Sequence, residues 1–231
     1  MSHRPSAAPA MPPSAPAMPP SARTTLRRKP QRGRYDAATI HAILDAALVC
    51  HVAFHEGGSV HSLPTVCWRV ADHLYIHGAR NGRLCAALLA GECAVSVALV
   101  DGLVLARSAF RHSMNFRSVV IYGQFAAVDD ADTARAACAA LVDHVSPGRS
   151  LLVRAPSPAE LAGTCLLRLP LAEAAAKVRS GGVEDNPDDL AWPAWAGVMP
   201  LTLQAGPLLP QPDCGPYPAP QPPAFLARRT A

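Results

Sequence analysis

A glycine-rich segment with two arginines is the part of the chain best suited to binding an anion. It reads Gly78-Ala-Arg-Asn-Gly-Arg83 and lies between a strand-like run and an Ala/Leu-rich run typical of a helix. Backbone N–H groups at a helix start, the helix dipole and guanidinium groups all stabilise a phosphate placed there. The residues predict either a phosphate cradle or an ordinary glycine turn with solvated arginines.

Histidines are the second candidate for chemistry, because six of the nine lie between His41 and His77. His51 and His55 are four residues apart on a predicted strand, which separates them by about 13 Å. The chain has no H-E-x-x-H pair and no Cys/His quartet of the kind that binds zinc. We therefore expect no metal site. Motifs for a nucleophilic serine, a Rossmann fold and a P-loop are also absent from the sequence.

Hydrophobic periodicity predicts the elements that must position these residues. Asp36 followed by apolar residues at three- and four-residue spacing predicts an N-capped helix over 37–48. Asp101-Gly102 predicts a tight hairpin between two strands. The remaining patterns predict strands over 50–55, 59–70, 73–77, 93–100, 103–110, 117–128 and 164–171, with a bulge or bend at Gly123. They also predict a helix in the middle of the segment 78–91, ended by Gly91, and a helix over 129–144.

Six or seven mostly antiparallel strands with helices before, between and after them predict a mainly β fold with peripheral helices. A small antiparallel barrel fits this order better than a doubly wound parallel sheet. Of the 24 prolines, eight lie in residues 1–30 and eight between Pro207 and Pro223. We expect a disordered Pro/Ala-rich basic arm over 1–33, one folded domain over 34–204 and a flexible Pro-rich tail over 205–231.

Composition narrows the class of protein. Half of the residues are hydrophobic and 16% are charged, which excludes wholesale disorder. No apolar run reaches the ~18–20 residues of a membrane-spanning helix, so no membrane role is expected. Seven basic residues and no acidic ones precede position 35, and the remainder of the chain is mildly acidic, which argues against a nucleic-acid partner for the folded part. The arm is either a solvated extension or a contact for phosphate or anionic lipid. Seven cysteines without a C-x-x-C pair fit a reducing cytoplasm.

Several segments together resemble a known family. They are Ile43–Phe54, Leu63-Pro-Thr65, Leu74–Gly78, Asp101–Phe110, His112–Val120 with Gly123, Ala176–Arg179 and Trp195–Leu201. In this order the chain resembles the FMN-binding split barrel of the pyridoxamine 5′-phosphate oxidase superfamily. More narrowly, it is similar to the branch related to nitroimidazole-resistance proteins. The resemblance covers about 160 residues and implies an antiparallel split β-barrel.

The resemblance also implies a homodimer that binds two FMN molecules at its interface, each contacted by both protomers. Backbone groups of Pro64, Thr65 and Val66 would meet the flavin edge, and the turn Gly78–Arg83 would hold the phosphate. Ala79 and Asn81 depart from the residues typical of the oxidases, so Arg83 is expected to carry more of the phosphate binding than Arg80. The other cofactor-binding residues that the resemblance implies are Gly78, Ala79, Ser113, Asn115, Ser118 and Trp195, and Trp195 is alternatively an interface anchor. Lys177 and Arg179 are two residues apart and share a strand face, where they would bind an anionic substrate or a phosphate across the dimer or form ordinary salt bridges.

His51 is the predicted catalytic residue, because the nitroimidazole-resistance branch has a histidine near the flavin at this position. A neutral imidazole there could donate a proton to a reduced substrate, and the alternative is an ordinary strand histidine. The expected function is an FMN-dependent oxidoreductase that reduces nitro or quinone-like small molecules, with NAD(P)H as a candidate donor. The alternatives are a non-catalytic flavin-binding protein and a haem- or deazaflavin-binding relative.

Overall fold

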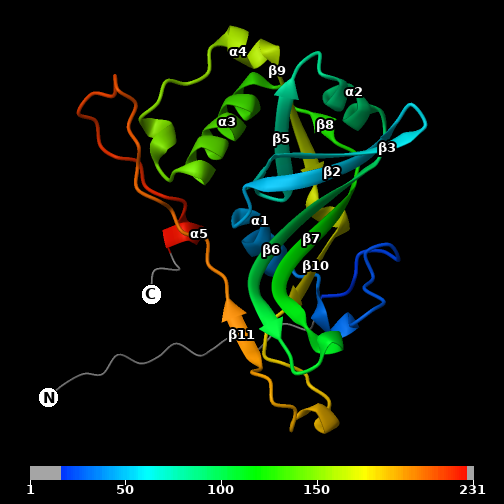
Figure 1. Cartoon of the computed structure of the whole chain (residues 1–231). Coiled ribbons are helices and arrows are strands. Elements are labelled where there is room, and N and C mark those ends of the chain that lie inside the picture. The colour runs from blue at the N-terminus through cyan, green and yellow to red at the C-terminus, as the bar shows by residue number, and fades with distance from the viewer. Residues whose placement is uncertain (1–16, 228–231) are drawn as a thin grey trace, which may run out of the picture.

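Two antiparallel sheets make up the β structure of this computed structural model, which describes residues 17–227 (Figure 1). The first sheet has the order β1-β10-β7-β6-β2-β3, with β11 paired to β6. Its strands are β1 (Gly33–Arg34), β2 (Val49–Glu56), β3 (Ser59–Val66), β6 (Cys93–Leu105), β7 (Ser113–Gly123), β10 (Ala174–Arg179) and β11 (Gly197–Pro200). The second sheet has the order β4-β5-β9-β8 and contains β4 (Trp68–Val70), β5 (His73–Ala79), β8 (Ala126–Ala127) and β9 (Thr164–Pro170).

Helices fill the space between the sheets and cover one of them. The helix α1 (Ala37–Asp45) inserts Ile40, Ile43 and Leu44 into the core that both sheets share. The helices α3 (Ala131–Val145) and α4 (Pro158–Gly163) pack on the other face of the four-stranded sheet, over Trp68 and Leu166. The remaining helices are α2 (Arg83–Ala90), α5 (Ala224–Ala227) and the 3-10 turns Pro30–Arg32, Ala109–Arg111, Arg149–Leu151, Leu171–Glu173 and Pro187–Asp189.

The predicted mainly β, antiparallel fold with peripheral helices is confirmed. Barrel closure is not, because the two sheets are hydrogen-bonded separately within residues 17–227. The strand predicted over 59–70 is divided at Cys67, where the chain passes from one sheet to the other as β3 ends and β4 begins. The Cys67 N–H donates to the carbonyl of Leu48 at 3.1 Å, which continues the pairing of β2 with β3 by one residue before the chain crosses to the other sheet.

The hairpin predicted at Asp101-Gly102 is wrong. β6 runs through both residues as one long strand, with an irregular register between Val100 and Gly102. The Asp101 carboxylate accepts two hydrogen bonds from Arg117 on β7, both at 2.8 Å. Gly102 lies against β11, where an added Cβ would be 3.0 Å from the Met199 carbonyl oxygen. Contacts with residues distant in sequence therefore favour an irregular strand over a turn.

The terminal segments lie closer to the sheets than expected. Residues 1–16 of the predicted arm lie outside the described residues, but the remainder contacts the domain. Ser21 Oγ donates to Glu173 at 2.7 Å, Arg23 Nε donates to the same carboxylate at 3.0 Å, and Thr24 is buried. Near the other end, Ser146 Oγ donates to the Gln221 carbonyl at 2.7 Å. These ion-paired and hydrogen-bonded segments differ from the free arm and tail that composition predicted.

Membrane insertion through a helix finds no support in the described part of the chain. None of its helices combines the length and the apolar character needed to cross a bilayer.

The N-cap of α1 generates a stability prediction. Asp36 Oδ1 accepts from the Thr39 N–H at 2.8 Å, and the hydrogen bonds from Thr39 lower the pKa of Asp36 below its ordinary value of 3.8. Asp36→Ala should reduce the free energy of unfolding at pH 7 by about 0.5–2 kcal/mol. Because the folded pKa is lowered, the contribution of the charged form is present above pH 3.8 and lost as the pH falls through the folded pKa.

Urea unfolding at pH 7 and at about pH 3 checks this, with Asp36→Asn as the control that keeps an acceptor oxygen. The difference between the parent and Asp36→Ala should shrink at the lower pH. A difference that stays equal at both pH values, or an Asn variant as unstable as the Ala variant, would contradict the capping role.

Candidate functional site

The outer face of the seven-stranded sheet carries several of the predicted site residues. Strands alternate their side chains between two faces, and Val52, Val95 and Val119 point into the core. Their neighbours point outward: His51 lies opposite Pro64 on one side and opposite Ser96 on the other. His51 is exposed, as expected for a residue that would meet a ligand on this face.

The next row of the same face continues toward β10. Ala98, Ser118 and Lys177 lie opposite one another across β6, β7 and β10. Ser118 Oγ donates to the Lys177 carbonyl at 3.3 Å, which fixes the hydroxyl near the predicted basic residue. The sheet therefore brings His51, Ser118 and Lys177 to one exposed surface, although they are far apart in sequence.

Arg179 and Asn115 are engaged with each other. Arg179 is only 6% exposed, and its guanidinium donates to the side-chain oxygen of Asn115 and, at 3.1 Å, to the Gly182 carbonyl. Its Nε has no hydrogen-bond partner within residues 17–227. Both side chains are therefore held at the end of the sheet, and the Arg179 Nε–H can donate to a further group.

The far end of this face is apolar. Met199, Leu103 and Met114 form one cross-strand row over β11, β6 and β7, and all three are exposed. The ring of Trp195 lies against Gly197, where an added Cβ would be 2.6 Å from it, and the side chain is 69% exposed. Ser113 is also exposed at this end, but it lies opposite the buried Val104 and so belongs to the other face of the sheet.

The predicted phosphate cradle forms where β5 ends and α2 begins. Gly78 and Ala79 end the strand, and Gly82 is the N-cap of α2 without a side-chain cap. The Gly82 N–H donates to the Ala79 carbonyl at 2.8 Å, and an added Cβ on Gly82 would be 2.9 Å from that oxygen. This tight turn leaves the first N–H groups of the helix without a side-chain cap, as an anion site requires.

The two arginines of the cradle differ in their partners. Arg83 Nε lies 3.2 Å from Glu56 Oε2, so a carboxylate already offsets its charge. No carboxylate within residues 17–227 lies within 4 Å of the Arg80 guanidinium, and Arg80 is held through its backbone N–H, which donates to the Gly163 carbonyl at 3.0 Å. The sequence predicts that Arg83 contributes more to phosphate binding than Arg80, and this geometry does not favour that prediction.

Glu56 is the residue of this site that sequence reasoning missed. It ends β2 just before Gly57-Gly58 and contacts both Arg83 and, at 3.9 Å, His61. Its partner Arg83 lies 27 positions further along the chain, and no local pattern signals such a pair.

A buried thiol lies under the turn: Cys85 Sγ would be 3.1 Å from a Cβ added to Gly78. Burial raises the pKa of the Cys85 thiol to about 12, so it adds no negative charge beneath the cradle.

The predicted residues fall into two groups on one chain. His51, Pro64, Thr65 and Val66 lie on β2 and β3, near α2, which carries the cradle and contacts β2. Ser113, Asn115, Arg179 and Trp195 lie at the opposite end of the long strands β6 and β7 (Figure 1). One chain therefore does not bring all of them around one small ligand. Lys177 and Ser118 lie between the two groups.

Two solved structures are similar to this chain over most of its length. The flavocytochrome Anf3 from Azotobacter vinelandii is 37% identical, with a TM-score of 0.82 over 90% of this chain and 97% of its own. The FAD and haem binding protein from Mycobacterium smegmatis is 35% identical, with a TM-score of 0.77 over 81% of this chain and 94% of its own.

A more distant structure shares the fold alone. It is described as a candidate 5-nitroimidazole antibiotic resistance protein from Bacteroides thetaiotaomicron, and it is 20% identical with a TM-score of 0.54. The match covers 63% of this chain and 86% of that one. A search of curated proteins finds no match.

The sequence itself matches a family model. Residues 36–178, which include α1, both sheets up to β10, and the cradle, match the model of pyridoxamine 5′-phosphate oxidase. The resemblance seen in the sequence is thus confirmed, and the chain belongs to the pyridoxamine 5′-phosphate oxidase-like family.

Proposed function

We propose that this protein binds a flavin nucleotide, with the phosphate at the start of α2 and the ring system on the outer face near β2 and β3. The observation that carries the proposal is the cradle: an uncapped helix start, a glycine turn with no room for a side chain, and an arginine that has no carboxylate partner among residues 17–227. Family membership and two flavin- or haem-named relatives above 30% identity support it.

Each part of the site has a defined task in this proposal. Arg80 and the first N–H groups of α2 hold the phosphate by charge-assisted hydrogen bonds. Backbone groups of Pro64–Val66, on the edge strand β3, bind the polar edge of the ring. The exposed imidazole of His51, opposite Pro64, supplies an N–H donor beside it.

A bound flavin supplies one- and two-electron transfer, and the chain supplies binding and orientation. We propose an oxidoreductase that passes electrons from a donor such as NAD(P)H to a nitro or quinone-like small molecule. The 20% identical structure described for nitroimidazole resistance supports only the fold, so turnover with such acceptors is the deciding test. A flavin-loaded protein that does not turn over would favour the non-catalytic alternative.

We propose that the active form is a homodimer. The outer face presents a broad surface of small and apolar residues, such as Ala98, Val120 and Leu103, which a second copy would bury. A partner would also bring Ser113, Asn115 and Trp195 from the far end of its sheet to the cradle of this one. A cytoplasmic location, expected from the cysteine content, stays a prediction.

Haem binding is a second proposed function, because one relative above 30% identity is named an FAD and haem binding protein and another is named a flavocytochrome. His112 is the chain's best axial ligand. Its Nδ1–H donates to the Ser108 carbonyl at 3.0 Å, which fixes the tautomer and leaves Nε2 for iron. His112 directly precedes β7 and is two residues before Met114 of the exposed apolar row.

The cradle generates a binding prediction. Arg80→Ala should weaken FMN binding by about tenfold or more, since a charge-assisted hydrogen bond to the phosphate is lost. Arg83→Ala should weaken it less, because Glu56 already offsets that charge. Fluorescence titration of the flavin-free protein measures both, and riboflavin, which lacks the phosphate, is the control that neither variant should affect. Equal losses for FMN and riboflavin would place the phosphate elsewhere.

The haem proposal generates its own prediction. His112→Ala should remove the Soret absorbance of protein purified from haem-supplemented cells and leave the flavin bands in place. Ser108→Ala is the matched control, because the contact to His112 uses the backbone carbonyl and survives the change. A Soret band of unchanged height and position in His112→Ala would exclude this histidine as the ligand.

A further inference from the structure

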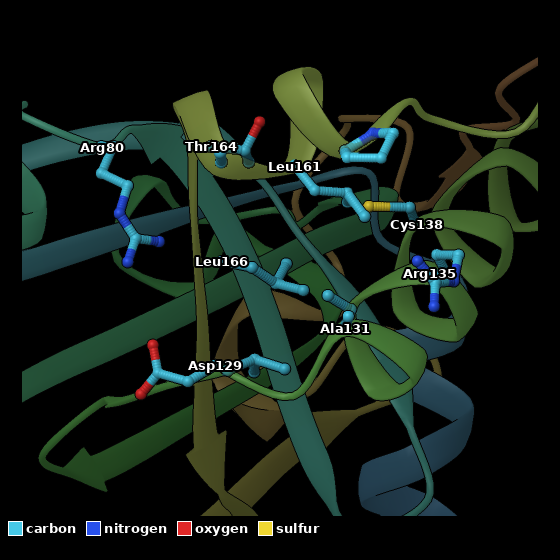
Figure 2. A pocket seen from close by; sticks show the side chains of 12 residues that line it. Arg80, Asp129, Ala131, Arg135, Cys138, Leu161, Thr164 and Leu166 are labelled. Atoms are coloured by element: carbon cyan, nitrogen blue, oxygen red, sulfur yellow. The ribbon is translucent and has the colours of Figure 1, made fainter.

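A cavity of about 800 Å³ lies beyond the C-terminal end of α3, between the 3-10 turn Arg149–Leu151 and the C-terminal segment. We name it the tail cavity, because residues of the segment 208–220 form one of its walls (Figure 1, orange to red). A different cavity, of about 390 Å³, lies near the start of α3 and includes Arg80 of the phosphate cradle (Figure 2). The tail cavity shares no lining residue with that cavity or with the cradle, so the two are separate.

Hydrogen bonds fix the wall of the tail cavity that follows α3. The Asp143 carboxylate accepts from the Ser150 N–H at 2.8 Å and from the Ser150 hydroxyl at 2.7 Å. The Leu152 N–H donates to the Arg149 carbonyl at 2.9 Å. These hydrogen bonds close the turn after the helix, and the turn contributes Arg149, Leu152 and Val153 to the cavity lining.

The opposite wall is the Pro-rich segment that composition predicts to be flexible. It contributes Leu208, Leu209 and Tyr217 together with three prolines. The Tyr217 ring packs on the backbone, because a Cβ added to Gly215 would be 2.9 Å from it. The end of the segment is tied to the end of α3, where the Ser146 hydroxyl donates to the Gln221 carbonyl at 2.7 Å. Since proline has a fixed φ and no N–H group, this wall is stiff and poor in hydrogen-bond donors.

The lining of the tail cavity is apolar apart from one cation. Arg149 is the one charged residue in this lining, and no carboxylate within residues 17–227 lies within 4 Å of its guanidinium. Leu152, Leu208 and Leu209 are 69%, 59% and 87% exposed, so residues 17–227 leave much of the apolar wall uncovered. Exposed apolar surface gathered around a single cation is typical of a site for an anionic amphiphile.

We propose that the tail cavity binds a single-chain carboxylate amphiphile, which is the chemistry of a free fatty acid. The hydrocarbon chain lies between the leucines of the two walls, and the carboxylate accepts charge-assisted hydrogen bonds from Arg149. A volume of about 800 Å³ is within the usual range for small-molecule sites. Walls on two sides suit one narrow chain better than they suit the flat surface of a protein partner. The proposal goes beyond flavin binding and does not depend on it.

Isothermal titration calorimetry of the full chain as purified, with octanoate, decanoate and dodecanoate, tests the binding of the hydrocarbon chain. The affinity should rise about three- to fourfold for each added CH₂ group, because each one buries more apolar surface. Leu208→Glu should weaken dodecanoate binding by about tenfold or more, since it places a charge in the apolar wall. Leu190→Glu is the matched control, because Leu190 is 60% exposed and lies outside the lining, and it should leave the affinity unchanged.

Arg149→Ala tests the binding of the carboxylate. It should weaken dodecanoate binding by about fivefold, because a charge-assisted hydrogen bond at an exposed site is lost. The affinity for 1-dodecanol, which has the same chain and no charge, should not change. Equal losses for dodecanoate and 1-dodecanol would overturn the proposal. So would an affinity that does not rise with chain length, or equal effects of Leu208→Glu and Leu190→Glu.

Discussion

The alternation of side chains along β2, β6 and β7 is the constraint on which the site depends. Val52, Val95 and Val119 are almost fully buried, and this fixes the register of all three strands against the core. A slip of one residue would expose these valines and bury His51 and Ser118. The outer surface is therefore determined by the packing of the inner one, and α1 helps to hold it by filling the space between the sheets.

The same core positions the cradle. β5 lies within the four-stranded sheet with its end beside β9, and the Arg80 N–H is tied to Gly163 there. Because α2 starts immediately afterwards and packs on β2, its uncapped N-terminus lies beside the end of β2, where Arg83 meets Glu56. Neither sheet alone would bring an anion site and a ring-sized surface together. The passage of the chain between the sheets at Cys67 makes this arrangement possible.

Features that depend on neighbours in sequence were predictable. Asp36 caps α1 through Thr39, three residues away, and Gly57, Gly58 and Gly123 have the positive φ angles that their places in turns and bends require. The hairpin predicted at Asp101-Gly102 is wrong because Arg117 and β11, both remote in sequence, hold these residues in a strand. The cavity lined by Arg80 had no local signal, since its walls combine Arg80 with residues from the separate segments 128–138 and 158–166. The relative contributions of Arg80 and Arg83 to phosphate binding also depend on a residue distant in sequence, Glu56.

Native mass spectrometry of the purified full-length chain tests the central claim most directly, because it reports the number of protomers and the mass of every bound cofactor together. The claim is that the outer face and the cradle form a flavin site that a second copy completes. The account predicts a dimer that carries two flavin nucleotides. A monomer that retains a flavin nucleotide, or a dimer whose mass leaves no room for one, would contradict it.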